Sequence, residues 1–153
     1  MSEYHAPLKD IRFTLNQICG LEELLALPGF ADCDGDTVNA VLEEADRLAS
    51  GILAPLNRQG DTQGATLANG VVTTPDGFRD AYGAFRDGGW NGIQFDPQYG
   101  GMGLPLVIGN ACAELWNSAN MGFALCSMLT QGAIDAVGTH GSFSINASGN
   151  WSY

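Results

Sequence analysis

Apolar positions at helical spacing dominate the first third of the chain. After Pro7, apolar side chains recur every three or four residues up to Ile18, and Gly20 follows. Proline is tolerated in a first helical turn and glycine ends helices, so this spacing predicts a first helix. The segment "LEELLAL" after Gly20 indicates a further helical turn, closed by Pro28 and Gly29.

The clearest amphipathic stripe begins at Asp36. Aspartate is a good N-cap, and apolar residues follow it along one face while charged residues occupy the other. We expect this helix to pass Pro55 and to end at the sequence "NRQGD". Residues 57–75 then form a long polar connection, in which Asn69-Gly70 between short apolar runs predicts a small β-turn or hairpin.

Two more apolar stretches complete the predicted fold. Residues 76–86 place apolar side chains on one side of a helix that Gly88 and Gly89 end. Residues 104–137 are almost continuously apolar, interrupted by "WNSAN" and "TQG", which indicates two or three buried helices rather than one membrane span. The pattern predicts an all-α domain, a bundle of about five to six helices with a small irregular or β-turn insertion. Its expected core includes Leu42, Leu48, Ile52, Phe78, Tyr82, Phe85, Leu115 and Leu125.

The net charge of the chain argues against two classes of binding partner. The chain has 6 basic and 17 acidic residues, a net charge of −11, so we expect it to bind neither nucleic acid nor an anionic membrane surface. Charged residues make up only 15% of the sequence. This low fraction suggests that a second domain or another subunit covers part of the surface. The first ten residues lack the apolar core of a signal peptide, and we expect a cytoplasmic protein.

Cysteine and histidine offer little catalytic or metal-binding chemistry. The four cysteines are far apart, and in a chain without an export signal we expect reduced thiols that are mostly buried. Only two histidines are present, so we expect no metal site. Cys126 and His140 would form a nucleophile–base couple only by a coincidence of folding, and a buried thiol with a helix-end histidine is the simpler interpretation.

The glycine-rich segment "FDPQYGGMGLP", residues 95–105, raises the question of a phosphate-binding loop. A P-loop needs Lys-Ser/Thr after its last glycine, and a dinucleotide fingerprint needs a preceding strand. Here Leu104-Pro105 follows, between segments that are predicted to be helical. We interpret the loop as a sharp structural turn in which glycines adopt positive φ and Pro105 starts the next helix.

The order of these motifs resembles a known family. The run "GGWNGIQFDPQYGGMGLP", the helix ending in "ELWNSANMGFAL" and the following "GAIDAVGTHGS" are similar to the N-terminal helical domain of acyl-CoA dehydrogenases. The opening "YHAPLKDIRFTLNQI" with "LLALPGF" resembles the N-terminal extension of the subgroup that includes 3-methylmercaptopropionyl-CoA dehydrogenases. The resemblance covers residues 4–142. It implies an N-terminal extension over residues 1–35 and the helical domain over residues 36–142.

The resemblance implies an FAD-dependent enzyme that removes an α-proton and a β-hydride from an acyl-CoA thioester. Its partners would be acyl-CoA, an electron-transfer flavoprotein or similar acceptor, and further copies in a homo-oligomer. The flavin-binding segment and the base glutamate lie in later domains of the family, so no catalytic or cofactor-binding residue is expected here. By the same resemblance, Ala124, Leu125 and Met128 line the acyl pocket. Ordinary core positions are an equally good reading of these three residues.

The sequence departs from the family after Ser142. The residues "FSINASGNWSY" have no helical periodicity, and residues 143–153 are expected to be an unrelated tail of a truncated chain. We therefore expect this chain alone to be inactive. The alternative function is a non-catalytic helical module that acts in binding or assembly. The stripe Trp116, Met121, Phe123 and Met128 is compatible with an apolar ligand pocket or with plain core.

Overall fold

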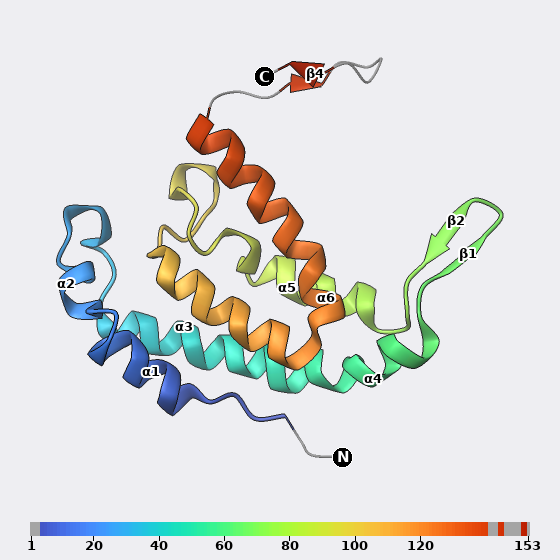
Figure 1. The fold of residues 1–153 in the computed structure, drawn as a ribbon, viewed down its shortest axis with the longest axis horizontal. Coiled ribbons are helices and arrows are strands. Elements are labelled where there is room, and N and C mark those ends of the chain that lie inside the picture. The colour runs from blue at the N-terminus through green and yellow to red at the C-terminus, as the bar shows by residue number, and fades with distance from the viewer. Residues whose placement is uncertain (1–3, 141–143, 146–150, 153) are drawn as a thin grey trace.

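The computed structural model describes residues 4–140, 144–145 and 151–152. Its α-helices are α1 (Leu8–Gln17), α2 (Leu21–Leu25), α3 (Gly35–Leu48), α4 (Ala54–Gln63), α5 (Phe78–Asp87) and α6 (Leu106–His140). A π-helical turn lies at Ala49–Leu53, and 3-10 turns lie at Pro28–Phe30, Trp90–Gly92 and Pro97–Tyr99. The antiparallel strand pairs are β1 (Thr66–Ala68) with β2 (Val71–Thr73), and β3 (Ser144–Ile145) with β4 (Trp151–Ser152). The prediction of an all-α bundle with a small β insertion is confirmed (Figure 1).

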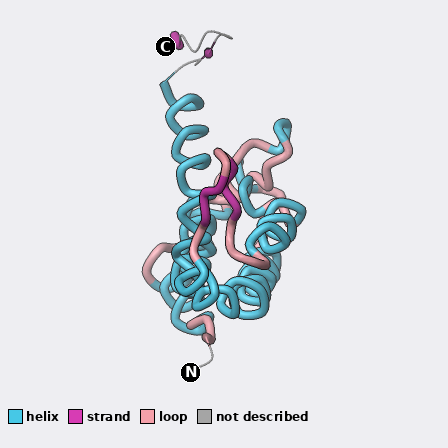
Figure 2. Tube along the Cα trace, turned by 90° about the vertical axis from the view of Figure 1, so that its right-hand side faces the viewer, coloured by secondary structure: helices cyan, strands magenta, loops and turns pink. Residues whose placement is uncertain are grey.

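The helices pack around one long rod formed by α3, the π-helical turn and α4. The first half of α6 runs beside this rod, and α1 packs against α3 (Figure 1). Figure 1 shows the β1–β2 pair standing out from the helices, and in Figure 2 the pair, in magenta, lies in front of them. Among the described residues, none of the helices is long and apolar enough to cross a membrane. Most of the expected tail, residues 143–153, lies outside the described part of the chain.

Helix α3 begins at a different cap from the predicted one. Asp34 is the N-cap, and its Oδ1 accepts hydrogen bonds from Thr37 N and Thr37 Oγ1, both at 2.7 Å. These hydrogen bonds lower the pKa of the Asp34 carboxyl. The prediction of Asp36 as the cap was wrong, because Asp36 lies within the first turn of the helix. There its negative charge interacts favourably with the positive end of the helix dipole.

The rod passes Pro55, as predicted, but it runs beyond the expected end at "NRQGD", residues 57–61. A proline ring inside an α-helix clashes with the carbonyl four residues earlier. The π-helical turn directly before it replaces the usual hydrogen bond with one from Ala54 N to Ala49 O, five residues apart, which widens the helix at this point. Helix α4 therefore runs to Gln63, and Gly64, with φ of 63°, ends it.

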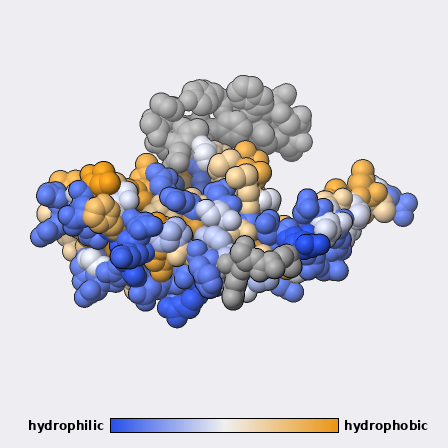
Figure 3. All heavy atoms as spheres, turned by 60° about the horizontal axis from the view of Figure 1, so that its bottom comes forward, coloured by the Kyte–Doolittle hydropathy of each residue, from blue (hydrophilic) through white to orange (hydrophobic). Residues whose placement is uncertain are grey.

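The β1–β2 hairpin was predicted and is confirmed. Its two turn residues, Asn69 and Gly70, have φ of 51° and 77°, as a two-residue hairpin turn of the primed type requires. Leu67 pairs with Val72 in the ladder. Both hairpin strands are exposed along their whole length. Figure 3 shows hydrophobic atoms along this arm, at the right of the view.

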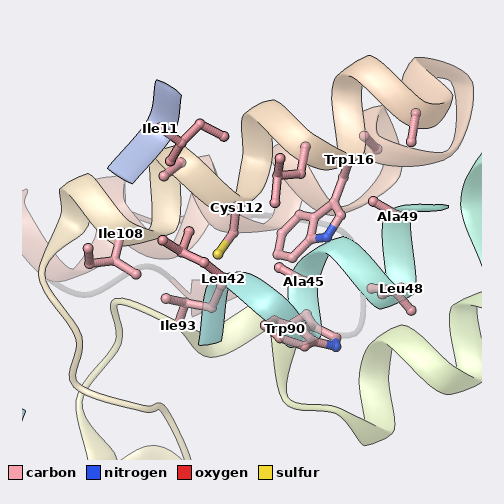
Figure 4. Close-up of a cluster of buried hydrophobic side chains, with 14 of the residues drawn as sticks. Ile11, Leu42, Ala45, Leu48, Ala49, Trp90, Ile93, Ile108, Cys112 and Trp116 are labelled. Atoms are coloured by element: carbon pink, nitrogen blue, oxygen red, sulfur yellow. The ribbon is translucent and has the colours of Figure 1, made fainter. Parts of the chain in front are cut away.

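The core lies where the rod, the first half of α6 and the segment after α5 meet. In Figure 4, Leu42 and Ala45 of α3 face Cys112 and Trp116 of α6. The Trp116 ring makes edge-on contacts with Phe85, at 4.7 Å between ring centroids, and with Trp90, at 5.6 Å. Aromatic pairs in this geometry add to the free energy of burying the rings themselves.

Half of the predicted core residues are buried. Leu42, Leu48, Phe85 and Leu115 belong to the core. The others were wrong as fully buried positions: Phe78 is half-buried, and Ile52, Tyr82 and Leu125 are exposed. Ile52 was misplaced because the extra residue of the π-helical turn rotates the helix face, so that Leu53 takes the buried position.

Candidate functional site

The glycine-rich loop does not present free amides to a ligand. All amide groups of residues 99–104 donate hydrogen bonds to backbone carbonyls of residues 92–97. Gly100 and Gly103 have φ of 87° and 67°, and a Cβ at Gly101 would collide with the carbonyl oxygen of Phe95. Because a phosphate cradle needs unpaired amides, the loop acts as a structural turn.

Helix α6 is broken at Asn120, within the predicted interruption "WNSAN". Asn120 has φ of −160° and ψ of 85°, outside the helical region. Its side chain is buried and donates from Nδ2 to Leu53 O at 3.0 Å, while Oδ1 accepts from Phe123 N at 3.1 Å. One side chain thus caps the second half of α6 and ties it to the end of the π-helical turn.

A groove of about 700 Å³ opens beside this break. It lies between the last turns of α4, the base of the hairpin, the start of α5 and the first turn of α6 after Asn120. Its polar residues include Asp61 and Arg79, which can balance one another's charge. The groove is lined by Asn57, Gly60, Asp61, Ala65, Thr74, Pro75, Phe78, Arg79, Tyr82, Asn120, Gly122, Phe123 and Cys126.

Aromatic side chains give the groove its apolar character. Phe78 packs against Phe123 with 6.1 Å between ring centroids, and Tyr82 follows one turn after Phe78 on α5. Gly60 allows this arrangement, because a Cβ there would lie 2.7 Å from Cζ of Phe78. Such a surface can hold an apolar group. The sequence did not predict the groove, although Gly60 inside α4 is a signal of close packing.

The residues predicted for the acyl pocket lie beside the groove and outside its lining. Ala124 is buried on the inner side of α6, whereas Leu125 and Met128 are 45% and 49% exposed. The exposed pair lies in a row that we name the α6 stripe, which consists of Met121, Leu125, Met128 and Leu129. The structure therefore brings Leu125 and Met128 together and places Ala124 on another face. Their contact with an acyl chain stays a prediction.

The cysteines differ strongly in their surroundings. Cys33 and Cys112 are buried, and Cys19 and Cys126 are exposed, so the expectation of mostly buried thiols holds for half of them. Burial raises the pKa of the Cys112 thiol to about 12, which keeps it protonated and unreactive at neutral pH. The side chain of His140 lies outside the described residues. No group of metal-binding side chains occurs in the described part of the chain.

Sequence comparisons give the family context. The chain is 43% identical over 139 residues to 3-methylmercaptopropionyl-CoA dehydrogenase of Ruegeria pomeroyi, an alignment that covers 91% of the chain and 24% of that protein. The chain is a homologue of the acyl-CoA dehydrogenases. No protein-family model matches it.

Two other acyl-CoA dehydrogenases are also similar. A broad-specificity linear acyl-CoA dehydrogenase of Mycobacterium tuberculosis is 30% identical over 110 residues, 71% of the chain and 18% of that protein. Butyryl-CoA dehydrogenase of Syntrophomonas wolfei is 26% identical over 138 residues, 88% of the chain and 22% of that protein. The chain therefore spans about a quarter or less of the length of these acyl-CoA dehydrogenases.

The described residues do not form a dinucleotide site of the Rossmann type. Such sites place unpaired amides after a strand of a parallel sheet, at a helix start. Here the glycine-rich loop uses its amides internally, and β1 and β2 form an isolated antiparallel pair.

Proposed function

We propose that this chain forms the N-terminal helical part of a flavin-dependent acyl-CoA dehydrogenase, which oxidises an acyl-CoA thioester to an enoyl-CoA. The supporting observation is the 43% identity over 139 residues to 3-methylmercaptopropionyl-CoA dehydrogenase. In this proposal the chain supplies shape rather than redox chemistry. Acyl-CoA is the substrate, a flavoprotein or similar carrier accepts the electrons, and the complete protein is a homo-oligomer.

Within this function, we propose that the second half of α6 contributes an apolar wall to the acyl site. Leu125 and Met128 are exposed on a helix whose outer face is not covered by the described residues. An acyl tail requires volume and apolar contact rather than hydrogen bonds, which these side chains provide. Ala124 lies next to them on the inner side of the helix, where it is buried in the core.

The test is a chimera in which this chain replaces the matched segment of the Ruegeria protein. We expect the chimera to retain bound flavin and to reduce an electron-accepting dye when acyl-CoA is added. In the chimera, Leu125→Trp should lower kcat/KM for long acyl chains relative to short ones by at least about tenfold, and Met128→Ala should do the reverse. Leu106→Ala, at an exposed position on the first half of α6 and outside the stripe, is the control. A folded, flavin-loaded chimera without activity would contradict the proposed function, and an unchanged chain-length preference would contradict the wall.

A further inference from the structure

The β1–β2 hairpin has the properties of a movable element beside the groove. An isolated two-stranded hairpin is marginally stable in water, and this one exposes Leu67 by 72% and Val72 by 65%. No backbone hydrogen bond joins residues 65–74 to the rest of the described chain. Figure 3 shows the arm projecting from the body at the right of the view, with hydrophobic atoms uncovered near its end.

The face of the hairpin that carries Leu67 and Val72 is also the face that borders the groove. Ala65 and Thr74, at the base of the two strands, line the groove. Side chains two residues apart in a strand point to the same face, so Leu67 continues the face of Ala65 and Val72 continues that of Thr74. The ladder pairs Leu67 with Val72, which places both on this one face. Val71 lies on the opposite face.

The base of the hairpin combines a fixed point with a hinge. Asp76 N donates to Gln63 Oε1 at 3.1 Å, which holds the end of α4 to the segment before α5. Gly64, the residue after Gln63, has φ of 63° and ψ of 177°, a conformation that residues other than glycine rarely adopt. No other atom lies within 4 Å of where its Cβ would be. Rotation about Gly64 and Thr74 would swing the arm while the base stays in place.

We propose that the β1–β2 hairpin is a lid that closes over the groove and encloses an aliphatic chain there. Closure brings Leu67 and Val72 onto the aromatic wall of the groove, which consists of Phe78, Tyr82 and Phe123. The apolar surfaces of the hairpin and of the groove wall are then both removed from water. Residues 64–75 carry no charge, so this movement desolvates no ionised side chain of the arm. The groove walls are mainly aromatic and its charges, Asp61 and Arg79, are opposite, so an uncharged chain is the ligand class that fits. This inference does not depend on the proposed dehydrogenase function.

Disulfide trapping tests the closure directly, because Cys126 lines the groove and is exposed. A disulfide requires Cβ atoms about 4 Å apart. In a Cys19→Ser background, Val72→Cys should form an intramolecular disulfide with Cys126 under mild oxidation, identified by peptide mass spectrometry. Val71→Cys is the matched control, since Val71 is equally exposed, at 64%, but lies on the opposite face of the hairpin. Circular dichroism confirms that both variants are folded.

The outcomes separate the lid from other arrangements. Preferential linkage of the thiol at position 72 to Cys126 supports closure. Equal linkage from position 71, no intramolecular linkage, or linkage between two copies would each overturn the lid. 1-Dodecanol, an uncharged aliphatic chain, then tests the ligand class by equilibrium dialysis. The reduced Val72→Cys protein should bind it, and the oxidised form should bind it several-fold more tightly at equilibrium, because the disulfide holds the closed state that encloses the ligand. Absent or unchanged binding would overturn the enclosed aliphatic chain.

Discussion

Gly101 shows how one missing side chain determines the shape of the loop before α6. A Cβ at this position would collide with the carbonyl oxygen of Phe95, which itself accepts a hydrogen bond from Gly103. We expect Gly101→Ala to lower the free energy of unfolding by about 1–3 kcal/mol, because backbone atoms would have to move. Urea denaturation followed by circular dichroism measures this change.

Gly83 provides the matched control for this substitution. It lies in the middle of α5, and nothing occurs within 4 Å of where its Cβ would be. Gly83→Ala should raise the free energy of unfolding by about 0.5–1 kcal/mol, since alanine favours helix more than glycine does. The two substitutions thus have opposite expected signs, and a stabilising Gly101→Ala would contradict the steric argument.

At the scale of elements, Asn120 links the two halves of α6 to the π-helical turn. Asn120→Ala leaves both Leu53 O and Phe123 N without their partner, so we expect a loss of about 1–3 kcal/mol in the free energy of unfolding. Asn117→Ala is the control, because Asn117 bonds only within its own helix, to Ala113 O, and should cost much less. Similar costs for the two variants would contradict a special role of Asn120.

Asn120→Asp separates the two hydrogen bonds of this side chain. The carboxylate can still accept from Phe123 N, but it faces Leu53 O, another acceptor. Burial and this repulsion raise the pKa of the introduced carboxyl in the folded protein above its unfolded value. The sign follows from linkage: the variant is most stable where the group is protonated and loses stability as pH rises through the folded pKa. Denaturation curves at pH 4 and pH 7 should show a smaller deficit at the lower pH.

Local pattern was enough to predict most of these elements. The positions of α1, α5 and the β1–β2 hairpin follow from Pro7, from Gly88-Gly89 and from Asn69-Gly70, whose conformational preferences act within a few residues. How the helix passes Pro55 was not predictable in the same way. It depends on a π-helical turn, and Leu53 O in that turn bonds a side chain 67 residues away.

The groove depends even more on tertiary contacts. Phe78 and Tyr82 were predicted to be buried because their spacing fits one face of α5. Helical spacing shows that two residues share a face, but it cannot show whether another element covers that face. Here the break at Asn120 and the exposed hairpin leave both rings at a groove. The family resemblance pointed to the neighbouring part of α6, and the role of its residues stays a prediction.

At the scale of the whole molecule, the α6 stripe should make the 153-residue chain associate with itself. An uncovered row of four apolar side chains favours contact with another apolar surface. The net charge of −11 opposes association, so added salt should strengthen it by screening the repulsion. Sedimentation velocity should show association that the double variant Leu125→Gln, Met128→Gln removes. Leu106→Gln, at an exposed position on the first half of α6, is the control, and equal loss in both variants would contradict the stripe.

The last prediction concerns flavin and catalysis by this chain alone. The chain corresponds to 24% of the Ruegeria enzyme, and its described residues provide neither unpaired loop amides nor a parallel sheet for a dinucleotide. We expect the purified 153-residue protein, mixed with excess FAD and passed through a desalting column, to elute without the flavin absorbance band. Because the cofactor carries the redox step in such enzymes, added acyl-CoA should then produce no enoyl-CoA at any detectable rate, rather than a slower reaction. The Ruegeria enzyme, treated identically, is the positive control. Stoichiometric bound flavin that bleaches when acyl-CoA is added would contradict this prediction. It would mean that this chain holds the cofactor without free amides in the glycine-rich loop and without a parallel sheet.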